Sequence, residues 1–148
     1  MTREEILREV KKNFDINELV CDHTYARWKD AAWQFLDTDL LHVLYVLRRQ
    51  ILNVPLYCNS KTSHQKGLRC NMCQLVKSKT GIYLSSHCLG KALDLTSPVM
   101  KAEKMRELIK ASADKLPCPV RIEAGVSWLH IDVLPQYGIT QKVYEFKG

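Results

Sequence analysis

The stretch Ser127–Val133 reads Ser-Trp-Leu-His-Ile-Asp-Val, and it decides both the fold and the chemistry of this chain. Successive side chains of a β-strand point to opposite faces. Leucine, isoleucine and valine then share one face, which we expect to lie in the core. The other face carries Trp128, His130 and Asp132, where a histidine is available to a ligand. The alternation therefore predicts a strand over Trp128–Val133 with one chemically active face.

Further strands and several helices surround this stretch. Strands are predicted at Pro55–Cys58, Ala92–Leu95, Val120–Ala124 and Lys142–Phe146, and the polar residues Ser60–Lys66 are predicted to form a loop. Capping signals and helical spacing predict helices from the Thr2-x-x-Glu5 capping box to about Asn13, over Tyr25–Leu36, from Asp37–Asp39 to about Leu52, and over Lys101–Ala113. Helices that precede closely connected strands predict an α+β fold in which N-terminal helices pack on a central antiparallel sheet.

Length and composition indicate one globular domain. The chain has 148 residues, of which 46% are apolar and 26% are charged. We expect a single domain over 1–148, with a helical part at 1–53 and an α+β part at 54–148 that carries the functional site. The charged start leads into no apolar segment of a signal peptide, so we expect synthesis in the cytoplasm.

Positive charge is concentrated in the middle of the chain. The net charge is +6, and the segment 61–91 has no acidic residue. Its cationic residues are Lys61, Lys66, Arg69, Lys77, Lys79 and Lys91. Such a segment favours an anionic partner, which could be nucleic acid, a cell-wall polymer or a carboxylate-bearing substrate. A solvated lysine-rich loop is the alternative.

The six cysteines include one C-x-x-C pair, Cys70 and Cys73. A zinc ribbon needs a second such pair, and the sequence has none. Cys58 or His64 could complete a zinc site with the first pair, but their spacing is irregular. We therefore favour buried, reduced thiols over a structural zinc site. A nucleic-acid-binding module built on this pair and the basic segment is a rival interpretation.

Two histidines and an aspartate on neighbouring strands form a candidate zinc site. Asp94 lies on the face of Ala92–Leu95 opposite to its two leucines, and His87 precedes that strand. Together with His130, these residues could bind zinc through three protein ligands and leave a fourth position open, as catalytic sites do. The alternative is that the three side chains only satisfy one another on a polar sheet face.

The pattern His87-x-x-Gly90-x-Ala92-x-Asp94, followed later by Trp128-x-His130, resembles that of the zinc D-Ala-D-Ala carboxypeptidase family. That family includes phage endolysins, dipeptidases and L-Ala-D-Glu endopeptidases, and it shares its fold with the hedgehog signalling domain. The resemblance covers about Pro55–Val133, and the segment Gly67–Cys70 is similar to the turn before the first ligand. It implies a hedgehog-type, D-Ala-D-Ala peptidase-like fold.

The resemblance also implies roles for individual residues. It makes His87, Asp94 and His130 the zinc ligands. Glu123 resembles the general base, with a surface ion pair as the alternative. Arg69 resembles the arginine that binds a substrate carbonyl or carboxylate, with an exposed loop arginine as the alternative.

Further residues are predicted to have substrate-binding or structural roles. Substrate-binding roles are predicted for Ser86, Trp128 and Asp132, and Asp132 could instead orient a ligand. The remaining histidines, His23, His42 and His64, are predicted to be structural or exposed.

Taken together, these implied roles describe a zinc metallopeptidase of cell-wall degradation. Its substrate would be a peptidoglycan stem peptide, cut as a D-Ala-D-Ala carboxypeptidase or an L-Ala-D-Glu-type endopeptidase cuts it. Such a phage or prophage enzyme would reach the wall during phage lysis, with no nucleic acid or membrane as partner. A non-catalytic zinc domain of the same fold with a binding role is the alternative.

Overall fold

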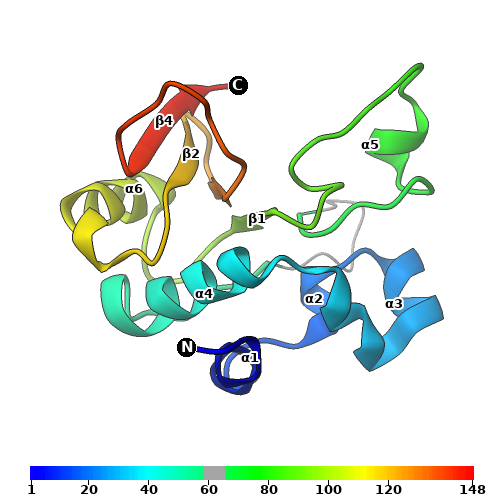
Figure 1. Cartoon of the computed structure of the whole chain (residues 1–148), viewed down its shortest axis with the longest axis horizontal. Helices are drawn as coiled ribbons and strands as arrows, with labels where there is room; N and C mark the ends of the chain where they lie inside the picture. The colour runs from blue at the N-terminus through cyan, green and yellow to red at the C-terminus, as the bar shows by residue number, and fades with distance from the viewer. Residues whose placement is uncertain (59–65) are drawn as a thin grey trace.

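Most helices precede the strands in this computed structural model, which describes residues 1–58 and 66–148, and α6 lies between the first strand and the other three (Figure 1). The helices are α1 (Arg3–Val10), α2 (Ile16–Leu19), α3 (Asp22–Trp28), α4 (Thr38–Val46), α5 (Gln74–Lys77) and α6 (Ala102–Ala111), with 3₁₀ turns η1 (Lys29–Phe35) and η3 (Ala113–Lys115) and a π turn η2 (Leu47–Ile51). The strands are β1 (Ala92–Leu95), β2 (Val120–Ala124), β3 (Leu129–Asp132) and β4 (Val143–Lys147). Within the described ranges, each helix is too short or too polar to cross a membrane.

The four strands form one mixed sheet in the order β1-β3-β2-β4. Strand β3 pairs antiparallel with β1 and with β2, whereas β4 pairs parallel with β2. The α+β class is confirmed, but the prediction of a purely antiparallel sheet is wrong. Residues 133–142 carry the chain past the beginning of β2 to its free edge, so β4 runs in the same direction as β2.

The two faces of the sheet have different chemistry. The apolar face joins the helices in a single hydrophobic cluster, to which the sheet contributes Leu93, Leu95, Val120, Ile122, Leu129 and Ile131. Residues from α1, α4 and α6 belong to the same cluster, for example Ile6, Leu44 and Met105. The polar face therefore remains for Asp94, Glu123 and His130, as the alternation in the sequence predicts.

The helix predictions were partly confirmed. Thr2 and Glu5 form the expected capping box, although α1 ends at Val10 rather than near Asn13. Asp37 caps α4, because its Oδ1 accepts hydrogen bonds from the backbone amides of Asp39 at 2.9 Å and Leu40 at 3.2 Å. The helix predicted from Asp37–Asp39 to about Leu52 is confirmed, but its last turn is a π turn. The helix predicted over 101–113 is α6, which covers only 102–111.

One predicted helix and one predicted strand are wrong as single elements. The stretch Tyr25–Leu36 breaks at Lys29, whose φ of 49° ends α3 and starts the 3₁₀ turn η1. Within Pro55–Cys58 only an isolated bridge forms, between Tyr57 and Thr96. The predicted loop Ser60–Lys66 lies outside the described residues apart from Lys66. The strand prediction at 120–124 matches β2, while β3 is shorter and β4 begins one residue later than predicted.

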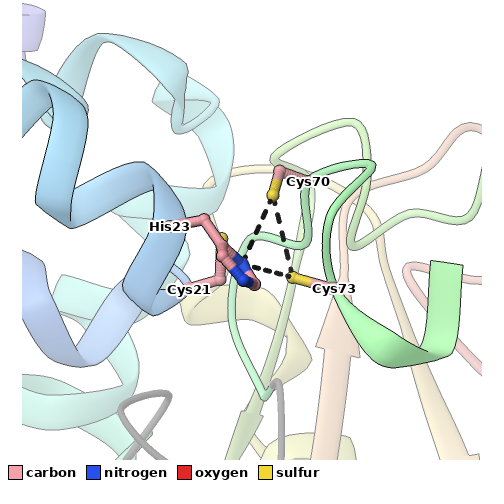
Figure 2. Close-up of side chains that lie close together, drawn as sticks. All are labelled: Cys21, His23, Cys70 and Cys73. Carbon is pink, nitrogen blue, oxygen red and sulfur yellow. Dashed lines mark hydrogen bonds between the residues drawn. The ribbon is translucent and has the colours of Figure 1, made fainter. Parts of the chain in front are cut away.

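A short backbone junction connects the N-terminal helices to the segment before β1. Val20 and Leu68 form a parallel bridge, in which the Cys21 amide donates to the Leu68 carbonyl at 3.0 Å and the Leu68 amide donates to the Leu19 carbonyl at 2.9 Å. Figure 2 shows that cysteine and histidine side chains from both segments meet beside this junction. The junction therefore brings together residues that are about 50 positions apart in the sequence.

Candidate metal centre

The register of the sheet places three functional side chains on one face. Asp94 on β1 lies opposite His130 on β3. On the other side of β3, Ile131 lies opposite Ile122, and Glu123 is the next residue of β2, on the face of the strand opposite to Ile122. Cross-strand neighbours point to the same face of a sheet. Asp94, His130 and Glu123 therefore project together from the polar face.

A tight turn before β1 supplies His87. The Ser85 carbonyl accepts a hydrogen bond from Leu89 at 3.2 Å, and the Ser85 hydroxyl accepts one from the Cys88 amide at 3.3 Å. Gly90 ends the turn with a φ of +69°, a region that L-residues rarely adopt. A Cβ at Gly90 would also overlap the backbone carbonyl oxygen of Phe35. Glycine is thus required here by backbone conformation and close approach.

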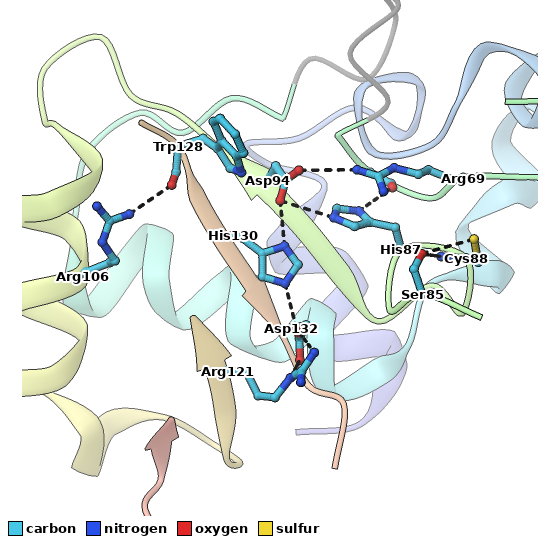
Figure 3. A network of polar contacts seen from close by, with 11 residues as sticks. Arg69, Ser85, His87, Cys88, Asp94, Arg106, Arg121, Trp128, His130 and Asp132 are labelled. Carbon is cyan, nitrogen blue, oxygen red and sulfur yellow. Dashed lines mark hydrogen bonds and ion pairs between the residues drawn. The ribbon is translucent and has the colours of Figure 1, made fainter. Parts of the chain in front are cut away.

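The donor atoms of His87, Asp94 and His130 converge, with all of them within 4.8 Å of one another. Asp94 Oδ1 lies 2.9 Å from His130 Nδ1 and 3.4 Å from His87 Nε2. Figure 3 shows the Asp94 carboxylate between the two imidazole rings. All three residues are buried. The structure thus brings together the three residues that the sequence singled out.

The second nitrogen of each histidine is held by a fixed partner. His87 Nδ1 donates to the Gly67 carbonyl at 2.9 Å, which leaves Nε2 facing Asp94. His130 Nε2 donates to Asp132 Oδ2 at 2.7 Å, which leaves Nδ1 facing Asp94. Metal-binding histidines commonly donate their other ring nitrogen to a carbonyl or carboxylate. Both rings are therefore oriented in the way that a metal ligand requires.

Asp132 is itself anchored from β2. Arg121 forms a bidentate ion pair with it, with Nε at 2.7 Å from Oδ1 and Nη2 at 3.0 Å from Oδ2. The guanidinium also lies over the Phe146 ring, with 4.8 Å between Cζ and the ring centroid. Phe146 meets the edge of His130 at a centroid distance of 5.7 Å. The imidazole is thus positioned by a carboxylate, an arginine and an aromatic ring.

The electrostatics of this group favour a cation. Burial tends to raise the pKa of Asp94, but hydrogen bonds from His130 and His87 outweigh it and lower that pKa to about 2. Burial tends to lower the pKa of His130, but hydrogen bonds to Asp132 and Asp94 raise it to about 9. Without a metal, the two carboxylates therefore hold a proton on His130, and a metal ion bound at Nδ1 would take the place of that proton.

The donor set fits zinc as well as its charge. Two imidazole nitrogens and one carboxylate oxygen are a ligand combination found in catalytic zinc sites, which leave a further position open. The group opens into a cavity of about 490 Å³. The cavity is lined by Arg69, Tyr83, Leu84, Ser85, Ser86, His87, Asp94, Arg121, Glu123, Trp128, His130, Leu134 and Phe146. A ligand in this cavity would therefore contact the donor group directly.

Most of the other predicted site residues line the same cavity. Arg69 Nη2 lies 3.8 Å from Asp94 Oδ2, so Arg69 is a partly buried partner of the donor group rather than an exposed loop residue. Glu123, Ser86 and Trp128 all line the cavity, and the Trp128 carbonyl is fixed by a 3.2 Å hydrogen bond from Arg106. The structure thus gathers these side chains where a substrate could meet them.

Asp132 requires a correction. Its predicted substrate-binding role is wrong, because the residue is 0% exposed and both carboxylate oxygens are bonded to His130 or Arg121. Its alternative role, orienting a ligand, agrees with these contacts. The role of Arg121 could have been predicted from its place on the same strand face as Glu123. The role of the Gly67 carbonyl could not, because every residue has a backbone carbonyl.

The basic segment is divided between several environments. Lys91 pairs with Asp37 at 2.7 Å, so it anchors the turn to α4 instead of facing the cavity. Lys79 lies over the ring of Tyr83, with 5.1 Å between Nζ and the centroid, and Tyr83 lines the cavity. Lys77 is exposed, and Lys61 lies outside the described residues. Among the cations of this segment that the structure describes, Arg69 lines the cavity, Lys79 packs on a residue that lines it, and the Lys66 carbonyl accepts a 2.8 Å hydrogen bond from the Asp94 amide.

A second group of side chains that could hold a metal ion was missed in the sequence. Cys21, His23, Cys70 and Cys73 place one donor atom each within 4.8 Å of one another. Cys21 and His23, rather than Cys58 or His64, thus accompany the C-x-x-C pair, and His64 lies outside the described residues. The prediction of buried thiols is wrong for Cys70, Cys88 and Cys118, which are partly exposed. The overlooked signal was the Cys21-x-His23 spacing.

No protein-family model matches the chain, and no match was found among curated proteins or among solved structures. The resemblance to zinc peptidases therefore depends on the residues of the motif and on the geometry described above.

Proposed function

We propose that the chain is a zinc-dependent peptidase that hydrolyses peptidoglycan stem peptides, with a hedgehog-type fold of the D-Ala-D-Ala peptidase kind. The observation that carries the proposal is the convergence of His87, Asp94 and His130 at a cavity that Arg69 and Glu123 also line. A metal site alone would fit many functions. A carboxylate and a guanidinium beside it supply the two further groups that hydrolysis of a peptide bond requires.

Each residue at the cavity has a defined task in this proposal. Zinc held by His87, Asp94 and His130 would supply a Lewis acid beside the scissile carbonyl. Glu123, which lines the same cavity as His130, accepts a proton from the attacking water and returns it to the leaving amine. Arg69, with its planar set of donors, binds the carbonyl or carboxylate oxygen of the substrate.

The surroundings of Glu123 support its role as a base. Phe146 lies opposite Glu123 in the β2–β4 pairing, and its ring packs on His130. On the adjacent side, a Cβ at Gly148 would overlap the Glu123 carboxylate, so the backbone there lies close against it. These neighbours restrict the rotamers of Glu123, which is one of the residues that line the cavity.

The charge around the cavity suits an anionic substrate. Arg69 lies inside it and Lys79 beside it, and the whole chain carries a net charge of +6. Stem peptides have free carboxylates, and these would be attracted by such a cationic rim. The resemblance to the D-Ala-D-Ala peptidase family adds release to the cell wall during phage lysis, where the chain would meet this substrate.

The experiment is digestion of purified stem peptides, with the products identified by mass spectrometry. The wild type should cleave one defined bond. Glu123→Gln should lower the rate by roughly 10²–10⁴-fold without changing zinc content. Glu103→Gln, an exposed glutamate on α6, is the matched control and should keep the wild-type rate.

The outcomes separate the enzyme from its alternative. Equal rates for wild type and Glu123→Gln would remove Glu123 from the mechanism. A zinc-loaded wild type that cleaves neither the D-Ala-D-Ala bond nor the L-Ala-D-Glu bond of stem peptides would overturn the peptidase proposal. It would favour a zinc domain of the same fold with a binding role.

A further inference from the structure

A second cluster of metal-binding side chains lies away from the cavity, at the junction between the N-terminal helices and the segment before β1. Its members are Cys21, His23, Cys70 and Cys73 (Figure 2). Cys70 Sγ lies 3.7 Å from His23 Nδ1 and 3.9 Å from Cys73 Sγ, and Cys73 Sγ lies 3.9 Å from His23 Nδ1. Three of the four donor atoms thus form a nearly equilateral triangle, and Cys21 supplies the fourth.

These separations match the edges of a zinc coordination tetrahedron. With Zn–S bonds of about 2.3 Å and Zn–N bonds of about 2.0–2.1 Å, tetrahedral angles place two sulfur ligands about 3.8 Å apart and a sulfur and a nitrogen about 3.6 Å apart. Three cysteines and one histidine are also a ligand set typical of structural zinc. We propose that Cys21, His23, Cys70 and Cys73 bind a Zn²⁺ ion of their own, separate from the candidate catalytic metal.

The backbone presents these ligands without rearrangement. The Val20–Leu68 bridge fixes Cys21 beside the segment that contains Cys70. A turn closed by the Cys73 amide and the Cys70 carbonyl, at 3.1 Å, brings the two sulfurs of the C-x-x-C pair to the same side. The Met72 amide donates to Cys70 Sγ at 3.4 Å, and Thr24 Oγ1 lies 3.1 Å from Cys21 Sγ. Both contacts supply hydrogen bonds that a metal-bound thiolate can accept.

The ligand count indicates a structural role. Four protein ligands complete a tetrahedron, so the ion would have no open position for a reactant. The ion would instead connect two chain segments whose ligands are 47 to 52 residues apart, because Cys21 and His23 lie at the start of α3 and the cysteine pair precedes α5. Figure 2 shows the imidazole of His23 directed from its helix toward the two sulfurs.

The proposed ion would also support the candidate catalytic centre. Arg69 directly precedes Cys70, and its amide donates to the His87 carbonyl at 3.3 Å. Gly67, three residues before Cys70, accepts the hydrogen bond of His87 Nδ1. Loss of the thiolate-bound ion should therefore loosen the segment 66–73 and, through it, the placement of Arg69 and His87. The four ligands would act on the candidate catalytic centre only by holding Arg69 and His87 in place. They are therefore positioning residues and not catalytic residues.

Metal analysis with cobalt substitution tests the proposal. Wild type should bind two zinc ions per chain, and Cys73→Ser should bind one fewer, whereas the partly exposed Cys118 gives a matched Cys118→Ser control that keeps both. Cobalt-loaded wild type should show the near-ultraviolet charge-transfer band of thiolate–cobalt bonds. The double variant His87→Ala/His130→Ala should keep that band and lose the other metal, so the two sites can fail independently.

A second measurement needs no variant and remains valid if Cys73→Ser does not fold. Cysteine alkylation of the intact chain, followed by mass spectrometry, should find Cys70 protected when zinc is bound and reactive after chelation. Cys118, which is also partly exposed and lies outside both groups, should react alike in both states. Equal alkylation of Cys70 with and without zinc, or no thiolate–cobalt band in the wild type, would overturn the proposal.

Discussion

The two candidate metal-binding groups of this chain, the sheet site (His87, Asp94 and His130) and the cysteine cluster (Cys21, His23, Cys70 and Cys73), are constructed in opposite ways. His87, Asp94 and His130 depend on the register of a sheet and one tight turn, and they open into a cavity. The cysteine cluster depends on a single backbone bridge between distant segments, and its four donors would enclose an ion. Nitrogen and oxygen donors with an open position suit catalysis, whereas thiolates in a closed set suit structure. Donor chemistry and the supporting backbone thus indicate different tasks.

The largest loss of stability should come from Gly90→Ala, which changes the turn that carries His87 in the first of the two groups. The substitution forces alanine into a φ of +69° and pushes its Cβ into the Phe35 carbonyl oxygen, so we expect a loss of about 3 kcal/mol in the free energy of unfolding. Denaturant unfolding measures it. Gly81→Ala is the matched control, because Gly81 has a φ of +83° with nothing within 4 Å, and it should lose only about 1 kcal/mol.

Equal losses in the two glycine variants would show that the close approach to Phe35 contributes nothing. The turn would then be held by backbone conformation alone, and the support of His87 would be weaker than the contacts indicate.

Asp132→Asn should weaken zinc binding by His87, Asp94 and His130 and leave zinc binding by the cysteine cluster unchanged. The substitution removes the charge that orients His130 and pairs with Arg121, so zinc affinity at His87, Asp94 and His130 should fall roughly 10–100-fold. Competition with a chelator measures it, and Asp114→Asn, an exposed aspartate, is the control. Zinc at the cysteine cluster should be unaffected, which also reports that the variant is folded. A parallel loss at both sites would mean that the fold, and not the ligand, was disturbed.

The sequence predicted the sheet site far better than the cysteine cluster. Alternation along β1 and β3 placed Asp94 and His130 on one face, because side-chain direction in a strand follows directly from residue order. No such rule relates Cys21 and His23 to a pair 47 to 52 residues away, since their meeting depends on the tertiary bridge at Val20 and Leu68. The parallel direction of β4 was missed for the same reason, because strand order is a tertiary property.

The fold's local surprises have similar causes. Helical spacing over 25–36 did not reveal the break at Lys29, whose positive φ is unusual for lysine. Gly90 was only a position of the motif in the sequence, and the structure gives it a backbone role at Phe35. Side-chain patterns thus predicted which faces are polar, while backbone contacts between segments decided where each turn lies.

The smallest effect concerns the anchor that connects the sheet site to α4. Burial tends to raise the pKa of Asp37, but hydrogen bonds from Lys91 and from backbone amides of α4 lower it below the ordinary value of 3.8. Because the folded pKa is the lower one, Asp37 stabilises the fold above pH 3.8, and this contribution is lost as the pH falls through the folded value. Asp37→Ala should cost about 1 kcal/mol at neutral pH.

Unfolding of wild type and Asp37→Ala across the acidic range measures this contribution. The difference between the two should shrink below pH 3.8. Asp15→Ala is the control, because Asp15 occupies the N-cap of α2 without a side-chain capping hydrogen bond, and its cost should be smaller. A difference that stays constant down to the lowest pH would mean that the charge of Asp37 is irrelevant.

Anomalous diffraction at the zinc absorption edge, on crystals of the zinc-loaded chain, tests the central claim most directly. We expect one peak within about 2.0–2.2 Å of His87 Nε2, His130 Nδ1 and an Asp94 carboxylate oxygen. A second peak should lie among Cys21, His23, Cys70 and Cys73. Absence of the first peak from crystals that contain the second would contradict the assignment of His87, Asp94 and His130 as a metal centre.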